Sequence, residues 1–143
     1  MRTKEEINHG FRKLIHCSMQ VVEEKAEAVG LDKETAMRIS APFAGGMLQG
    51  HTCGAVSGAL MIIGAKYGHH QEGDEAGNAA MSAKTVKFLE AFTARNGSTQ
   101  CKDILGYDFS NPEEVAKAYE SGVIFETCPQ MVQDALAILE ELL

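Results

Sequence analysis

Four cysteines, Cys17, Cys53, Cys101 and Cys128, are spread along this chain of 143 residues. Thiolates attack disulfides and other oxidants, and they also bind soft metal ions. Several cysteines brought together by folding can therefore form a redox or a metal site. The alternative for each of them is an ordinary buried cysteine that packs as a small apolar side chain.

The spacing of the cysteines excludes some common sites. No two of them form a C-x-x-C pair, so neither a thioredoxin-type active site nor the usual zinc-ribbon spacing is predicted. The sequence also lacks C-x-x-C-H, the signature of covalent c-type haem attachment. Any shared site must therefore be assembled by the tertiary fold.

Cys53, Cys101 and Cys128 each follow residues that can cap a helix, and we expect each of the three at a helix start. The free backbone N–H groups and the positive end of the helix dipole stabilise a thiolate there. At least one thiol is therefore expected to have a pKa well below the ordinary value of about 8.5. Cys17 is predicted to lie in the middle of a helix, at the edge of its apolar stripe.

Two histidines directly precede cysteines, His16 before Cys17 and His51 before Cys53. Imidazole can accept a thiol proton or bind a metal. For His16 we expect a surface or packing role, because neighbouring side chains on a helix point about 100° apart. His51 lies in a glycine-rich loop and is the better site candidate. Cys53 is accordingly predicted to be the attacking thiolate, and one of the other three cysteines would resolve the intermediate.

The elements that must position these residues are all predicted to be helices. Apolar residues at 7–29 recur every three or four positions and predict one long helix. Further helices are expected over 33–40 after an Asp32 cap, from 53, from 81 to 96, over 101–105, from 112, and from 127 with Pro129 in the first turn. No segment predicts a strand. We expect an all-α, single-domain helical bundle of about five to seven helices over residues 1–143.

The predicted helix that follows Cys53 carries a face of small residues, Gly54, Ala55, Gly58 and Ala59. A neighbouring helix can pack closely on such a face. The neighbour could belong to the same chain or to a second copy, so a homodimer is one possible assembly.

Composition narrows the possible partners and the compartment. The formal net charge of -7 and the scattered basic residues argue against nucleic-acid binding. The sequence begins without an apolar signal-peptide stretch, and its most apolar segment, residues 53–65, is too short to insert into a membrane. We therefore predict a cytoplasmic protein, in which static disulfides are disfavoured.

The sequence resembles the C_GCAxxG_C_C family of redox-active proteins. The resemblance rests on CGAVSG at 53–58, and on Cys17 in HCSMQVV, Cys101 in GSTQCKDILGYD and Cys128 in CPQMVQDALAILEELL. These motifs occur in the family's order and cover nearly the whole chain. The resemblance implies a redox role centred on the four cysteines.

Three functions follow as hypotheses. The leading one is a thiol-dependent oxidoreductase that uses thiol/disulfide exchange or electron transfer with a redox partner protein or a small-molecule thiol or oxidant. The second is an iron–sulfur cluster or a zinc ion held by Cys17, Cys53, Cys101 and Cys128 without thiol catalysis. The third is a non-catalytic helical interaction module.

Overall fold

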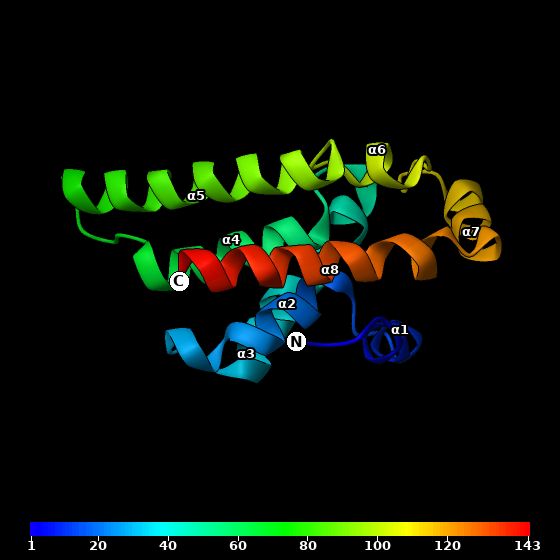
Figure 1. Cartoon of the computed structure of the whole chain (residues 1–143), viewed down its shortest axis with the longest axis horizontal. Coiled ribbons are helices and arrows are strands. Elements are labelled where there is room, and N and C mark those ends of the chain that lie inside the picture. The colour runs from blue at the N-terminus through cyan, green and yellow to red at the C-terminus, as the bar shows by residue number, and fades with distance from the viewer.

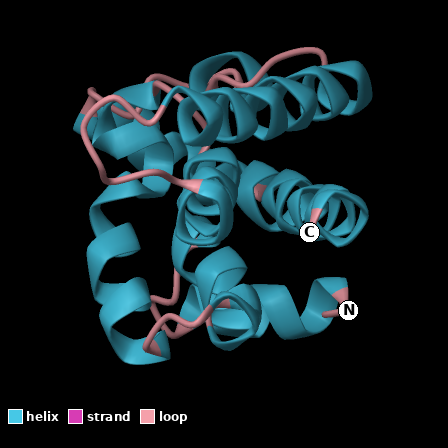
Figure 2. Ribbon diagram, turned by 90° about the vertical axis from the view of Figure 1, so that its left-hand side faces the viewer, coloured by secondary structure: helices cyan, strands magenta, loops and turns pink.

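The computed structural model describes residues 1–143, and it consists of helices joined by short connections (Figures 1 and 2). The helices are α1 (Lys4–Arg12), α2 (Cys17–Lys25), α3 (Lys33–Ser40), α4 (Gly54–Tyr67), α5 (Glu75–Asn96), α6 (Cys101–Leu105), α7 (Pro112–Ser121) and α8 (Val123–Leu142). This confirms the all-helical prediction. The eight α-helices exceed the predicted five to seven because the expected first helix is two separate helices.

Helix α4 lies in the middle of the molecule and packs against α2, α5 and α8 (Figure 1). The main hydrophobic cluster forms where these four helices meet, around fully buried residues such as Val56, Phe88 and Leu139. A second, smaller cluster joins α6, α7 and the first part of α8. Residues of both clusters line one cavity between them.

The break between α1 and α2 corrects the prediction of one long helix over 7–29. The N–H of Ile15 donates to the carbonyl of Gly10, and the N–H of Leu14 donates to that of Phe11, as in a Schellman C-cap. Leu14 has a φ of 66°, the left-handed conformation that glycine usually supplies at this position. No glycine, asparagine or proline marks this stop, so the break could not be predicted. The break makes Cys17 the first residue of α2.

The close approach of α2 to α4 uses the small-residue face of α4 that the sequence predicted. A Cβ atom built on Gly58 would lie 2.7 Å from the carbonyl oxygen of Ser18. A Cβ on Gly54 would lie 2.5 Å from Sγ of Cys17. Helix α2 of the same chain therefore covers this face of α4.

Other predicted helix boundaries are partly confirmed. Asp32 caps α3 and Asn111 caps α7 through their side chains, as expected. Helix α5 begins at Glu75, earlier than predicted, because Asp74 accepts a hydrogen bond from Gly77 N–H. Helix α4 begins one residue later than expected, with Cys53 rather than Thr52 as its N-cap.

Helix α8 starts at Val123 and not at Thr127, so Pro129 lies inside the helix rather than in its first turn. Proline has no N–H, and the carbonyl of Phe125 therefore loses its partner four residues on. The side chain of Asn8 in α1 donates a hydrogen bond of 2.9 Å to that carbonyl. This contact satisfies the carbonyl that Pro129 leaves without a helical partner, and it joins α1 to α8.

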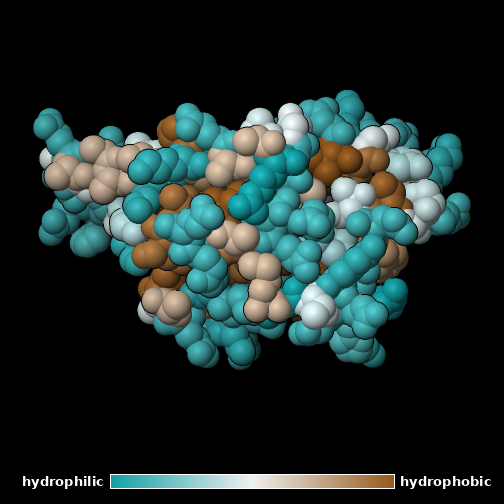
Figure 3. Space-filling view, viewed as in Figure 1, coloured by the Kyte–Doolittle hydropathy of each residue, from teal (hydrophilic) through white to brown (hydrophobic).

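The face seen in Figure 3 is mostly hydrophilic, and its apolar residues gather in patches along the seams between helices. None of the helices is both long and apolar enough to span a bilayer.

Candidate functional site

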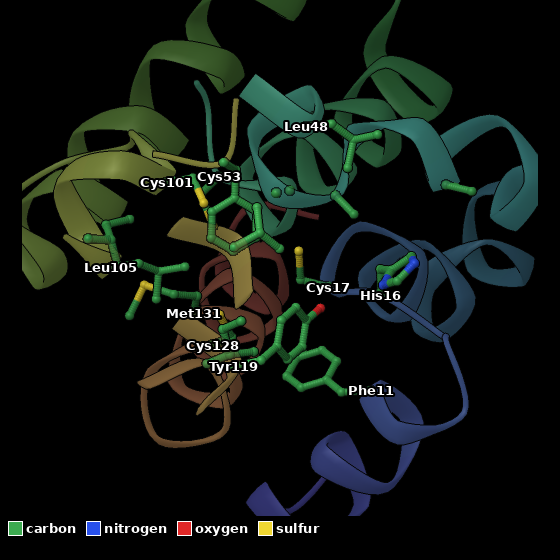
Figure 4. A pocket seen from close by; sticks show the side chains of 18 residues that line it. Phe11, His16, Cys17, Leu48, Cys53, Cys101, Leu105, Tyr119, Cys128 and Met131 are labelled. Atoms are coloured by element: carbon green, nitrogen blue, oxygen red, sulfur yellow. The ribbon is translucent and has the colours of Figure 1, made fainter. Parts of the chain in front are cut away.

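The four cysteines converge on one cavity of about 250 Å³. Cys17 begins α2, Cys53 caps α4, Cys101 begins α6, and Cys128 lies in α8. Figure 4 shows them around the same space, with Cys53 and Cys101 next to each other. All four are free thiols. The cavity lies where the two hydrophobic clusters meet, because Cys53 belongs to the main cluster and Cys101 to the smaller one.

A short backbone pairing holds Cys53 beside Cys101. The N–H of Cys53 donates to the carbonyl of Thr99 at 2.7 Å, and the N–H of Cys101 donates to the carbonyl of His51 at 2.6 Å. These bonds flank an isolated antiparallel bridge between Thr52 and Gln100. Residues placed diagonally across such a bridge lie roughly 7–8 Å apart and on the same side of it. The pairing thus directs both thiols into the cavity.

Helix starts position three of the thiols, but they are not the three that the sequence predicted. Cys53 and Cys101 lie at helix starts as expected. Cys17 lies at one as well, although we expected it in mid-helix. Cys128 lies in the interior of α8, because that helix begins five residues before it. Cys17 therefore lies at a helix start and Cys128 lies inside a helix, the reverse of the prediction.

The net effect of the site on thiol ionisation is opposite to the expectation of a lowered pKa. Burial is the largest cause for every one of the four thiols, and it raises the pKa of each. Burial and the charge of Cys17 raise the pKa of Cys101 to about 12. The pKa values of Cys53 and Cys128 are raised by burial and then by the other thiols. The reduced site is therefore uncharged at neutral pH.

Backbone N–H groups act on two of the thiols, Cys17 and Cys53; for Cys53 they are those of Ala55 and Val56. Burial raises the pKa of Cys17, but the N–H groups of Ser18, Gly45 and Ala55 oppose that rise. Ser18 belongs to the first turn of α2 and Ala55 to the first turn of α4, so two helix starts face the same sulfur. The charge of Cys17 in turn raises the pKa of each of the other three thiols. The Cys17 thiol therefore interacts electrostatically with all three other cysteines of the cavity.

The two candidate histidines are placed differently from the expectation. His51 is exposed and its imidazole does not line the cavity; its backbone carbonyl contributes by accepting the hydrogen bond from Cys101. His16 is the N-cap residue of α2 and does line the cavity. Burial lowers the pKa of His16, so its imidazole is neutral at pH 7. The expected packing role for His16 rested on the long helix that the structure divides.

Tyr119 is a cavity residue that the sequence analysis missed. It lies on α7, lines the cavity and is partly exposed at its edge (Figure 4). Burial, followed by the charges of Cys128 and Cys17, raises the pKa of its hydroxyl. No motif marks Tyr119 in the sequence, because its place depends on how α7 folds back onto α8.

A left-handed turn at residues 45–48 forms another part of the cavity wall. Met47 and Leu48 have φ values of 60° and 57°, and they follow Gly45 and Gly46, which are also left-handed. Left-handed conformations cost non-glycine residues roughly 1–2 kcal/mol each. The turn places Leu48, whose side chain is 61% exposed, on the cavity lining. Strain of this kind is often retained where it positions a functional residue.

The arrangement of ligand-type side chains does not form a preassembled metal site. No three His, Cys, Asp or Glu side chains lie close enough together to hold a metal ion. The sequence left open a zinc or cluster site formed by Cys17, Cys53, Cys101 and Cys128. These four cysteines line one cavity, but their side chains are not arranged to coordinate a metal ion. Binding of zinc or a cluster would require the thiols to move towards one another.

The C_GCAxxG_C_C family model, described as "Putative redox-active protein (C_GCAxxG_C_C)", matches residues 15–142 of the chain. The match includes all four cysteines and the CGAVSG motif. No curated protein and no solved structure matches the chain.

Proposed function

Because the chain belongs to the C_GCAxxG_C_C family of redox-active proteins, we propose that it performs thiol/disulfide exchange at the cavity, with Cys17 as the attacking thiol. The observation that carries the proposal is the convergence of four free thiols from separate helices on one cavity. A shared cavity lets a thiol that has attacked an oxidant be released by a second thiol of the same chain.

We propose Cys17 for the attack in place of Cys53, the choice made from sequence. Backbone N–H groups from the first turns of α2 and α4 favour the Cys17 thiolate, and Cys17 is less buried than Cys53 and Cys101. The neutral imidazole of His16 lines the same cavity and is the proposed acceptor of the Cys17 proton. His16 thereby takes the role that the sequence analysis gave to His51.

Cys53 is the proposed resolving thiol. It directly precedes Gly54, the residue whose missing Cβ leaves room for Sγ of Cys17, and the charge of Cys17 raises its pKa. The Cys17 thiolate attacks one sulfur of a disulfide R–S–S–R, and the departing RS⁻ takes up the proton as RSH. The Cys53 thiolate then attacks the Cys17 sulfur, releasing the second RSH with the Cys53 proton. Two thiols are oxidised to one disulfide, and one external disulfide is reduced to two thiols.

Single alanine variants at Cys17, Cys53 and Cys128 test the pairing. Each variant is equilibrated with mixtures of reduced and oxidised dithiothreitol, quenched with an alkylating agent, and analysed by mass spectrometry. The Cys17→Ala and Cys53→Ala chains are expected to lose the intrachain disulfide, whereas the matched control Cys128→Ala retains it. Persistence of the same disulfide yield in both the Cys17 and Cys53 variants would refute the assignment.

Iron–sulfur or zinc binding is the competing proposal, supported by the number of thiols at the cavity. Purification without oxygen, followed by iron, sulfide and zinc analysis, distinguishes the two. Stoichiometric metal that is lost in the cysteine variants would favour the metal site over thiol exchange.

A further inference from the structure

The wall of the cavity carries no charged side chain. Apart from the four thiols, its only polar side-chain atoms belong to His16 and Tyr119, and no Asp, Glu, Lys or Arg lines it. Phe11, Ile104 and Met131 are typical of the remaining lining. A charged ligand would lose its hydration there without meeting an opposite charge, which is strongly unfavourable.

The two polar groups are themselves neutral at pH 7. Burial lowers the pKa of His16 below its ordinary value, and burial raises the pKa of Tyr119. Each can exchange a hydrogen bond with an uncharged polar atom of a ligand. Neither can neutralise the carboxylates of an anionic compound.

The size of the cavity restricts the ligand further. An engineered apolar cavity of about 150 Å³ holds one benzene molecule, and this cavity measures about 250 Å³. It therefore accommodates roughly one aromatic ring with a few additional atoms. Cys53 and Cys101 are only 7% exposed and Cys17 is partly buried, so a sulfur that reacts with these thiols must enter the cavity.

On the basis of the thiol exchange proposed above, we propose that the oxidant is a small, uncharged, largely apolar compound with a disulfide-type sulfur that enters the cavity. Charged disulfides such as that of glutathione are then not its direct reactants. The chain's net charge of -7 further disfavours the approach of anions.

Three methanethiosulfonate reagents test this selectivity with the same chemistry and different charge. They are the neutral ethyl, the anionic 2-sulfonatoethyl and the cationic 2-(trimethylammonio)ethyl compounds. Each transfers its alkylthio group to a thiolate and releases methanesulfinate, and intact mass counts the modified thiols. The rate for the folded chain is divided by the rate for the same chain unfolded in urea, which cancels intrinsic reactivity. We expect the normalised rate of the neutral reagent to exceed both others at least tenfold.

A charge placed in the cavity wall should change this preference. Val115 lines the cavity from α7 and is half-buried, so a lysine there can keep its ammonium group near the edge. Val115→Lys is expected to raise the rate of the anionic reagent several-fold relative to the neutral one. The matched control is Val86→Lys on α5, at an exposed position outside the cavity, which should leave that ratio unchanged.

Equal normalised rates for the three reagents, or no labelling of the folded chain by the neutral reagent, would overturn the inference. Its failure is distinguishable from failure of the exchange mechanism. A chain that forms the Cys17–Cys53 disulfide but reacts equally with all three reagents contradicts only the substrate class. A chain that discriminates among them but forms no intrachain disulfide contradicts only the proposed function.

Discussion

Substituting alanine for two glycines of α4 is expected to change stability in opposite directions. At Gly58 the new Cβ would lie 2.7 Å from the backbone oxygen of Ser18, whereas ordinary contacts begin at 3.4 Å. Ser18 cannot easily retreat, because its buried hydroxyl is hydrogen-bonded to the carbonyl of Ser40 at 2.8 Å. At Gly64 the same Cβ would meet nothing within 4 Å.

The magnitudes follow from two opposing terms. Alanine is favoured over glycine inside a helix by about 1 kcal/mol, and this gain applies at both positions. Overpacking at Gly58 costs roughly 1–3 kcal/mol, or more where the obstacle is backbone. Gly58→Ala should therefore lower the free energy of unfolding by up to about 2 kcal/mol, while Gly64→Ala raises it by about 0.5–1 kcal/mol.

Urea unfolding followed by far-ultraviolet circular dichroism, under reducing conditions, measures both variants against the parent chain. The slope of the transition should remain the same, so that the midpoints report stability. If Gly58→Ala stabilises the chain as much as Gly64→Ala, the close packing of α2 on α4 is wrong.

Three further perturbations follow from the fold and the site. Leu14→Gly should stabilise the chain by about 0.5–1 kcal/mol, measured by thermal unfolding, because glycine adopts the left-handed C-cap without strain; a lower Tm would contradict the break between α1 and α2. Asn8→Ala should lower the free energy of unfolding by about 1–2 kcal/mol, measured in urea, because it leaves the Phe125 carbonyl unpaired. The loss should be smaller in a Pro129→Ala background, where the alanine N–H restores the helical hydrogen bond. Equal losses in both backgrounds would argue against this contact. Because burial raises the thiol pKa values, that of Cys101 to about 12, the reduced folded chain holds its thiol protons more tightly than the unfolded chain. The corresponding stability is fully present below pH of about 8.5 and is lost as pH rises towards the folded values, by at most about 1.4 kcal/mol per pH unit for each thiol. Urea unfolding under dithiothreitol at pH 7 to 10 measures this, and stability that rises with pH would reverse the assigned direction.

Much of the helical pattern could be predicted because its signals are local. Asp32 and Asn111 cap helices through their own side chains, and each precedes a helix as the sequence indicates. The Schellman turn at Leu14 could not be predicted, because a leucine occupies the left-handed position where glycine normally marks the stop. The interior position of Pro129 in α8 could not be predicted either, because it depends on a contact with a distant part of the chain. Asn8, more than a hundred residues away, supplies the donor that the helix itself lacks.

The candidate site was predictable in its cysteines and not in its surroundings. The cysteines are recognisable from their motifs, and the structure brings them to one cavity. Their electrostatics depend on burial, which the sequence does not reveal, and burial outweighs the effect of the helix starts. The sequence favoured His51 over His16 as the site residue, but His16 lines the cavity and His51 does not. His16 lies at a helix start because of the break at Leu14, which no residue marks in the sequence. Tyr119 depends wholly on tertiary packing.

Cysteines from distant parts of the chain are proposed to act as one redox unit, and a peptide map of the oxidised native chain shows whether they do. The chain is oxidised in a buffer of mostly oxidised dithiothreitol, its remaining thiols are blocked at acid pH, and it is digested without reduction. We expect a linked pair of peptides that contain Cys17 and Cys53, and return of both thiols when reduced dithiothreitol is added. A chain whose four thiols all remain alkylatable, or whose only disulfides join separate molecules, would contradict it.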